Sequence, residues 1–289
     1  MGKKRKVFPV FLLFAVSLIF MLIAALNTRK TIKRTDRPGS EDMKIICPRL
    51  NGCADAFLIY NQFGAMMIDT GEEADGELLL DLLREEGITS LDLLVLTHFD
   101  KDHIGGAPAI LDQIPVRTCY MPASDEEGDR YERLIAALEA GGTKTVFLTE
   151  PADLTRLSAS ITIYPPLAMT YKESTDNNLS LITSIKYQST ALLFMGDAET
   201  ERVSEYILNQ YDYTKYDFIK IPHHGRDVLT TNYLLYVLDP SDVLITSSRE
   251  EPENPEVLEK LQAEGVRTWL TRDGTVTMIV SREGLSVSQ

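Results

Sequence analysis

The chain has 289 residues, of which 44% are hydrophobic and 25% are charged, and these ordinary globular values exclude wholesale disorder, a collagen-like repeat and a polytopic membrane protein. Residues 1–37 hold nine cations and one anion (+8), which leaves 20 cations and 42 anions (-22) in the rest of the chain. A body this acidic disfavours broad, sequence-independent binding of nucleic acid, which requires a basic surface.

The first segment with a clear pattern is an apolar run at residues 7–26. It contains 20 uncharged, mostly apolar residues, and a helix of about 20 residues crosses a hydrocarbon core about 30 Å thick. Residues 1–6 before it are basic, and a second basic cluster begins at Arg29. We predict an uncleaved, single-pass signal anchor in the cell membrane with the following domain outside the cytoplasm; a cleaved signal peptide is the alternative. Residues 27–42 are polar and are predicted to be a linker.

From residue 43 onward, short apolar stretches alternate with amphipathic ones. The predicted helices lie at about 74–86, 127–140, 198–210, 229–238 and 255–264. The predicted strands lie near 43–49, 55–60, 64–69, 91–97, 116–121, 144–148, 160–164, 179–187, 190–195, 216–221, 242–246, 267–270 and 275–281. In the first helix, the spacing places Leu78, Leu79, Leu82 and Leu83 on one apolar face. This alternation predicts a layered α/β architecture in one domain at residues 43–289.

All four histidines fall into two short clusters, and the first lies at residues 98–103. Within six residues it holds His98, Asp100, Asp102 and His103, directly after an apolar strand and before two glycines, so we expect a loop at the end of the sheet. Imidazole and carboxylate are ligands suited to zinc, manganese or iron. A polar surface turn is the alternative, but two histidines flanking two aspartates favour a metal site.

Three other polar positions also follow apolar strands. His223 and His224 precede a glycine and can point to the same end of the sheet. Asp197 ends another strand, where its carboxylate can bridge two metal ions or cap the helix that follows. Asp69 has a similar place, and we expect it to support the metal loop from a turn rather than to bind metal itself.

The cysteines carry less information. Cys47, Cys53 and Cys119 are odd in number and match no zinc or redox spacing. We therefore expect unreactive thiols, with a Cys47–Cys53 disulfide as the alternative for an exported domain.

Together these motifs resemble the metallo-β-lactamase superfamily, and within it the hydrolase domain of ComEC-type DNA-uptake proteins. The matching segments occur in order at residues 55–59, 68–71, 97–106, 177–181, 195–199 and 222–225. The resemblance implies an αββα sandwich with a two-metal site at the edges of its sheets. It also implies hydrolysis by a water molecule that the metals activate.

The resemblance further implies two divalent ions, zinc or manganese, and a set of ligands for them. These ligands are His98, Asp100, Asp102, His103, Asp197 and His223. The first two would hold one ion, the next two would hold the other together with His223, and Asp197 would bridge both. Asp102 and His224 would be catalytic: Asp102 would orient the attacking water, and His224 would face the substrate phosphate.

The sequence departs from the superfamily pattern at three places. Asp100 stands where the usual second histidine of the motif would be, as in the ComEC-type branch, and no histidine occurs between 104 and 222 to complete the first site. Asn178 lies near that missing ligand, so we expect it to face the metal or the substrate. The turn at residues 49–55 also lacks the branch's glycine and glutamine pattern. The first site is therefore expected to be rich in oxygen ligands, which suits harder ions such as manganese.

Four functions are compatible with these motifs. The first is a membrane-anchored phosphodiesterase or nuclease, although residues 38–289, with a net charge of -22, are poorly suited to binding long nucleic acids. The second is the same chemistry on phosphate esters of a cell-wall polymer, which suits a tethered acidic domain. The third is a non-enzymatic surface module that binds metal. A β-lactamase is the weakest, since the shared motifs say little about substrate.

Overall fold

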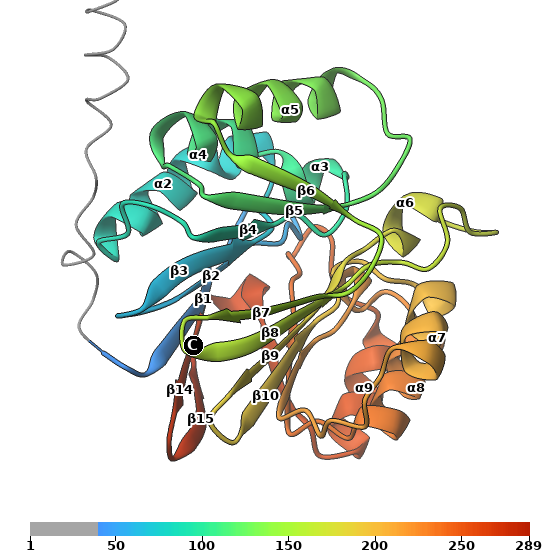
Figure 1. The fold of residues 1–289 in the computed structure, drawn as a ribbon. Coiled ribbons are helices and arrows are strands. Elements are labelled where there is room, and N and C mark those ends of the chain that lie inside the picture. The colour runs from blue at the N-terminus through green and yellow to red at the C-terminus, as the bar shows by residue number, and fades with distance from the viewer. Residues whose placement is uncertain (1–39) are drawn as a thin grey trace, which may run out of the picture. The chain divides into compact units, whose positions relative to one another are not determined.

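The structure is a computed structural model that describes residues 40–289. Two β-sheets pack face to face, and helices cover the outer face of each (Figure 1). The predicted αββα arrangement is therefore confirmed. The predicted membrane helix at 7–26 lies outside the described residues, and among residues 40–289 no helix has the length and apolar character needed to cross a membrane.

The first sheet has eight strands in the order β15-β14-β1-β2-β3-β4-β5-β6. Their bounds are β1 (Met43–Cys47), β2 (Phe57–Asn61), β3 (Gly64–Ile68), β4 (Leu93–Val95), β5 (Thr118–Pro122), β6 (Lys144–Leu148), β14 (Val276–Ser281) and β15 (Gly284–Ser288). Neighbours from β15 to β3 pair antiparallel, and neighbours from β3 to β6 pair parallel. The parallel half places the carboxyl ends of β3 and β4 at one edge.

The second sheet has seven strands in the order β13-β12-β11-β10-β9-β8-β7. Their bounds are β7 (Ala152–Arg156), β8 (Ala159–Tyr164), β9 (Ile182–Tyr187), β10 (Thr190–Phe194), β11 (Phe218–Lys220), β12 (Asp242–Ile245) and β13 (Arg267–Leu270). The four strands β10 to β13 are parallel, while β7 to β10 pair antiparallel. The carboxyl ends of β10 and β11 therefore also share an edge.

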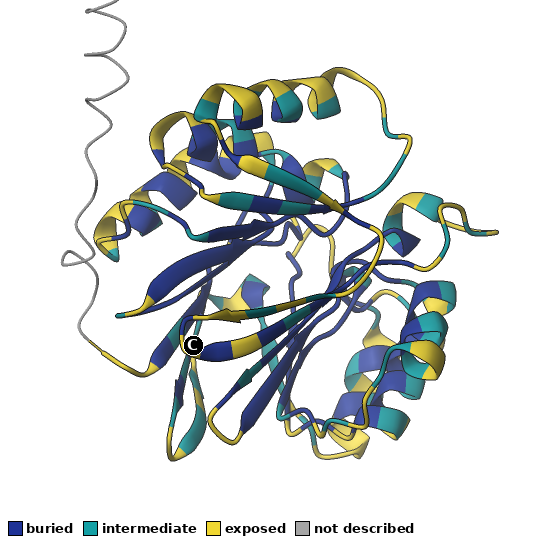
Figure 2. Ribbon diagram, viewed as in Figure 1, coloured by how far each residue is buried: buried dark blue, intermediate teal, exposed yellow. Residues whose placement is uncertain are grey.

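Three apolar layers hold this sandwich together. The middle layer lies between the sheets, where the Phe57 ring of β2 meets the Phe194 ring of β10 with centroids 5.0 Å apart. One outer layer lies under α2 (Gly76–Glu85), α4 (Ala107–Gln113) and α5 (Asp129–Gly141). The other lies under α7 (Thr200–Asn209), α8 (Val228–Leu238) and α9 (Pro255–Ala263). Figure 2 shows the buried residues on these inner faces.

The five longer helices lie where the sequence predicts them, with boundaries that differ by one or two residues. The buried face of α2 differs from the prediction. Leu79, Leu80 and Leu83 are fully buried, whereas Leu78 is 42% exposed. At 100° per residue, positions 79, 80 and 83 form a narrower stripe, and this stripe turns toward α4 and the first sheet.

Several short elements escape the sequence prediction. They are β7, β15, α3 (Lys101–Ile104), α4 and α6 (Thr175–Asn178). The two strands lie at sheet edges and contain no buried residue, and each has only two apolar residues, so their signal in the sequence is weak. The helix α3 also corrects the expectation of a loop throughout residues 98–103, since only His98 to Asp100 lie in a loop. All three cysteines are buried and free, as expected.

Candidate metal centre

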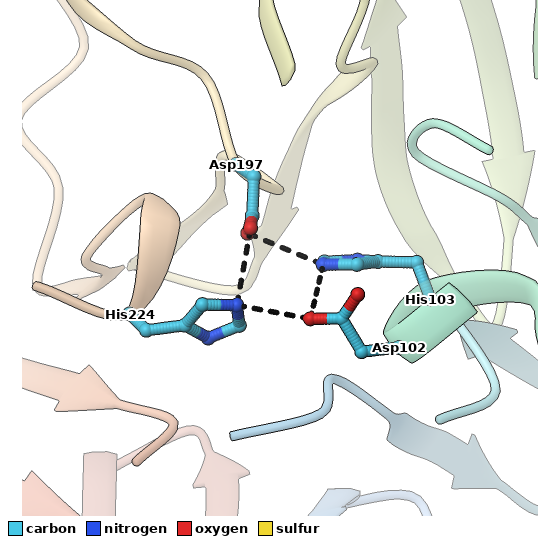
Figure 3. A group of neighbouring side chains, drawn as sticks. All are labelled: Asp102, His103, Asp197 and His224. Atoms are coloured by element: carbon cyan, nitrogen blue, oxygen red, sulfur yellow. Dashed lines mark ion pairs between the residues drawn. The ribbon is translucent and has the colours of Figure 1, made fainter. Parts of the chain in front are cut away.

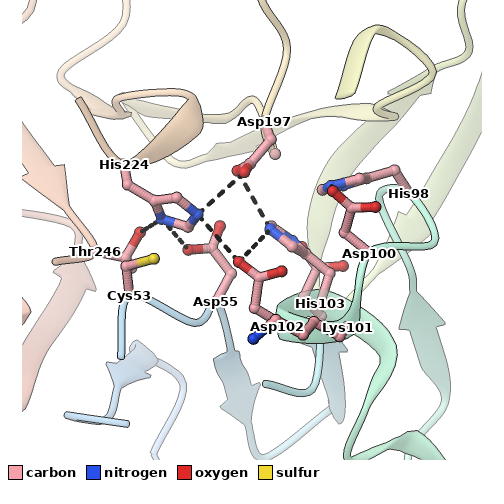
Figure 4. A network of polar contacts seen from close by, with 12 residues as sticks. Cys53, Asp55, His98, Asp100, Lys101, Asp102, His103, Asp197, His224 and Thr246 are labelled. Atoms are coloured by element: carbon pink, nitrogen blue, oxygen red, sulfur yellow. Dashed lines mark hydrogen bonds and ion pairs between the residues drawn. The ribbon is translucent and has the colours of Figure 1, made fainter. Parts of the chain in front are cut away.

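The candidate site lies where the ends of parallel strands from both sheets meet (Figure 4). The segment with His98 follows β4, and α3 then presents Asp102 and His103. From the second sheet, Asp197 follows β10 and His224 follows β11. Because the two sheets pack face to face with these edges together, residues more than 100 positions apart become neighbours.

Four side chains form the centre of the site (Figure 3). Ligand atoms of Asp102, His103, Asp197 and His224 all lie within 4.8 Å of one another. His103 Nε2 is 3.3 Å from Asp197 Oδ1, while His224 Nε2 is 3.1 Å from Asp197 Oδ2. His224 Nε2 is also 3.3 Å from Asp102 Oδ2. Both oxygens of Asp197 therefore face an imidazole.

These four residues fit a divalent ion. Among the described residues, the buried Nε2 atoms of His98, His103 and His224 have no hydrogen-bond partner, although carboxylate oxygens lie close to them. Two ligands at about 2.1 Å from one tetrahedral ion are themselves roughly 3.4 Å apart, which is similar to the separations in this cluster. The imidazole nitrogens and carboxylates are thus arranged as ligands around a common point rather than as hydrogen-bonded pairs.

Each of the three imidazoles is held from behind through its other nitrogen. His103 Nδ1 lies 2.8 Å from Asp69 Oδ2, His224 Nδ1 lies 3.0 Å from Thr246 Oγ1, and His98 Nδ1 lies 3.1 Å from Thr97 Oγ1. Partners of this kind orient a metal-binding imidazole and leave its Nε2 free to bind. Asp69 thus lies behind His103, the place expected for a residue that supports the metal loop.

The charges of the cluster are strongly coupled. Burial disfavours the charged form of His103, but the carboxylates of Asp197 and Asp69 outweigh it and raise the pKa of His103 well above its ordinary value. Burial by itself would raise the pKa of the Asp197 carboxyl. The charges of His224, His103 and Lys220 outweigh burial and hold this pKa well below its ordinary value. Without metal, protons on the imidazoles offset the carboxylates, and binding of a cation would release them.

The cluster carries a surplus of formal negative charge. Five aspartates lie in or directly behind it, and one buried lysine accompanies them: Asp55, Asp69, Asp100, Asp102, Asp197 and Lys220. Five negative charges less one positive charge leave four negative charges. Neutral imidazoles add nothing to this balance, so the surplus favours the binding of cations.

The proposed first ion has fewer ligands. His98 Nε2 is 3.6 Å from Asp100 Oδ2, and the rings of His98 and His103 lie 4.0 Å apart between centroids. This pair is therefore next to the four-residue cluster, as Figure 4 shows. The neighbouring imidazole of His98 lowers the pKa of Asp100, whose side chain is still 45% exposed. An ion there would take its remaining ligands from Asp197 or from water.

The two adjacent histidines have different places. The resemblance assigned His223 to the metal, yet the structure brings His224 into the cluster and leaves His223 beside Glu199, with His223 Nδ1 3.1 Å from Glu199 Oε1. Burial lowers the pKa of His223. His223 lines a pocket of about 170 Å³ that also exposes Asp102 and Asp197. It is thus placed at the mouth of the site.

Asn178 does not face the metal or the substrate, which corrects the expectation for this residue. Its Oδ1 accepts hydrogen bonds from the backbone N–H groups of Glu199 and Arg202, at 3.0 and 3.1 Å. Its Nδ2 donates to the Glu173 carbonyl at 2.9 Å. Asn178 therefore accepts hydrogen bonds from N–H groups at the start of α7, and Asp197 does not cap this helix.

Sequence reasoning gave no role to Lys220, Asp55 or Glu199. Lys220 is fully buried, and the carboxylates of Asp55 and Asp197 raise its pKa in spite of the burial. The signal that would have indicated it is a lysine at the end of an apolar strand, since a buried lysine requires an anionic partner. Glu199 accepts a hydrogen bond from Asn177 Nδ2 at 2.8 Å and faces His223.

Comparisons with known proteins identify the family of the chain. The family model described as the metallo-beta-lactamase superfamily matches residues 54–249. The chain belongs to this superfamily. The matched region extends from the loop before β2 to beyond β12, so it includes every segment of the candidate metal centre.

Two curated superfamily relatives are similar in sequence. ComE operon protein 3 of Bacillus subtilis is 26% identical over 236 residues, which are 75% of this chain and 30% of the relative. Recombination protein 2 of Haemophilus influenzae is 28% identical over 202 residues, which are 68% of this chain and 23% of the relative. The chain thus matches less than a third of the length of either relative. The predicted likeness to ComEC-type proteins is confirmed.

A solved structure supports the fold. The metallo-β-lactamase fold protein YhfI of Bacillus subtilis has a TM-score of 0.55 with 12% sequence identity, and the match covers 86% of this chain and 100% of that protein. At this identity the likeness shows the metallo-β-lactamase fold alone.

Proposed function

We propose that the chain is a metal-dependent phosphodiesterase or nuclease. The observation that carries this proposal is the Asp102, His103, Asp197 and His224 cluster, in which one carboxylate presents an oxygen to each imidazole. Together with His98 and Asp100, the cluster fits two divalent ions. When bound, such ions activate water and offset charge on phosphoryl oxygens.

The residues of the chain have distinct tasks in this proposal. His224 replaces His223 in the set of metal ligands. Asp102 is partly open to the pocket, with 19% of its side chain exposed, and its carboxylate can accept a hydrogen bond from the attacking water. His223, beside Glu199 at the pocket mouth, contacts a phosphate oxygen of the substrate.

A phosphodiester substrate is favoured over an amide by its charge and by the name of one relative. A phosphodiester carries charge on its oxygens, and two cations offset this charge more strongly than they polarise a neutral carbonyl. One relative is named a recombination protein, and recombination is a reaction of DNA. Phosphate esters of a cell-wall polymer remain the second substrate class, because the net charge of -22 on residues 38–289 disfavours the binding of long nucleic acids.

The test uses the purified full chain in detergent, stripped of metal by a chelator and then reloaded with Mn²⁺ or Zn²⁺. We expect about two ions per chain and Mn²⁺-stimulated cleavage of bis-p-nitrophenyl phosphate, but no turnover of nitrocefin. Single-stranded DNA and poly(glycerol phosphate), assayed in parallel, distinguish a nuclease from a wall-polymer enzyme. Bound ions without cleavage of any substrate would favour the non-enzymatic module, and activity in metal-free protein would contradict the proposal.

We further propose that residues 7–26 anchor the chain in the cell membrane with the hydrolase domain outside the cytoplasm. The proposal is supported by the 20-residue apolar run and its preceding basic residues. Protease added to intact cells is expected to remove the domain, as detected with an antibody against its C-terminus. If the domain is digested only after lysis, the orientation is reversed.

A further inference from the structure

Lys220 is a buried cation directly behind the candidate metal centre. It ends β11, between β10 and β12, and its side chain has no exposed surface. Its strand neighbours Phe218 and Ile219 are fully buried in apolar layers. A charged ammonium in such surroundings is costly unless every N–H group has a partner.

The Nζ of Lys220 has three oxygen partners, two through hydrogen bonds and one through an ion pair. Its Nζ donates to the Gly196 carbonyl at 2.8 Å and to Asp197 Oδ1 at 3.2 Å. The third partner is Asp55 Oδ2, at 2.5 Å. One contact therefore holds the backbone before Asp197, another holds its carboxylate, and the third reaches a different segment of the chain.

The contact with Asp55 connects the two sheets. Asp55 lies just before β2 of the first sheet, and its backbone N–H donates to the Asp102 carbonyl at 3.0 Å. Lys220 ends β11 of the second sheet, and Asp197 follows β10 of the same sheet. Asp102 and Asp197 lie at opposite corners of the four-residue cluster (Figure 3). The contacts from Asp102 through Asp55 and Lys220 to Asp197 therefore connect the two sides of the site.

We propose that Lys220 is a positioning residue that orients the Asp197 carboxylate and keeps the two halves of the metal cluster in register before any ion binds. The inference rests on the metal site of the proposed function. Asp197 Oδ1 accepts a hydrogen bond from Lys220, and the same oxygen also faces His103 Nε2. Its fixed charge also stabilises a cluster of buried carboxylates in the metal-free protein.

The test compares the full wild-type chain with the double variant Asp55→Asn/Lys220→Met. This variant removes one negative and one positive charge, so the net formal charge of the site stays the same. Replacing both members of a buried ion pair by neutral side chains of similar size is often tolerated. The measurements are the Tm of the metal-free protein and the Kd for Mn²⁺ by titration calorimetry.

We expect the double variant to remain folded and to bind Mn²⁺ roughly 10- to 100-fold more weakly, the range typical when a group that supports metal ligands is lost. A Kd within about twofold of wild type would overturn the proposal and make Lys220 only the partner of Asp55. Wild-type protein that binds no Mn²⁺ would instead refute the metal site itself.

Two further variants complete the experiment. Lys220→Gln is the second test variant in case the double variant does not fold, and its Kd is judged by the same limits. It removes only a positive charge, which by itself favours cations, so weaker binding would show lost positioning. Lys186→Met/Asp212→Asn is the matched control, because it removes an exposed ion pair of 2.7 Å between β9 of the same sheet and the segment before β11, and we expect its Kd to be unchanged.

Discussion

Asp197→Asn is expected to lower metal-stimulated hydrolysis of a model phosphodiester by more than about 100-fold, since even residues that only support metal ligands are worth 10- to 100-fold. Asp197 faces His103 and Lys220 with one oxygen and His224 with the other. An amide has one oxygen, so its NH₂ group would face Lys220 or an imidazole that requires an acceptor. An amide also cannot bridge two cations as a carboxylate does.

This variant is expected to stay folded. Asn178, not Asp197, accepts the hydrogen bonds at the start of α7, so the substitution removes no helix cap. The rate of bis-p-nitrophenyl phosphate cleavage and the far-UV circular dichroism measure the two effects, with Asp212→Asn on the exposed surface as the control. Near-native rates would show that Asp197 is not a ligand.

The second large effect distinguishes the two adjacent histidines. We expect His224→Asn to lose a bound ion and to lower kcat/KM by more than about 100-fold, because His224 Nε2 faces both Asp102 and Asp197. His223→Asn is expected to retain both ions and to lower kcat/KM by roughly 10- to 100-fold, which corresponds to one hydrogen bond to a charged substrate. Metal content per chain is the deciding measurement.

Asparagine is the appropriate replacement at both positions. The backbone of His223 and His224 is left-handed, with φ of 47° and 54°, and asparagine adopts this conformation more readily than most residues. Loss of an ion from the His223 variant but not from the His224 variant would reverse the assignment and restore the one implied by the resemblance. Equal loss from both variants would point to a local structural change.

The sequence alone was sufficient to predict the layered fold and the segments that carry most of the candidate ligands. Apolar runs of strand length and amphipathic helices leave a strong local pattern, so the main elements lie within a few residues of their predicted places. The segment 98–103 and Asp197 each follow a buried strand, so the sequence alone places both at strand ends. They follow strands of different sheets, however, and only the packing of the two sheets makes them neighbours. The edge strands β7 and β15 escaped because they bury few apolar residues.

Only the tertiary structure decided which side chains face the metal cluster. His223 and His224 are adjacent and chemically identical, and the left-handed turn at the end of β11 sends one to the cluster and the other to Glu199. Asn178 stands near the expected third ligand in sequence, yet its three hydrogen bonds commit it to α7 and Glu173.

Lys220 is the clearest example of a residue whose contacts the sequence does not reveal. In the sequence it is one charged residue at the end of an apolar strand, with no local pattern that names a partner. Its partners are Asp55, which lies 165 positions earlier beside the first sheet, and Gly196 and Asp197, which follow β10 of the second sheet. The physical reason is that a buried charge is stabilised by contacts between segments remote in sequence, and these exist only once the two sheets have packed together.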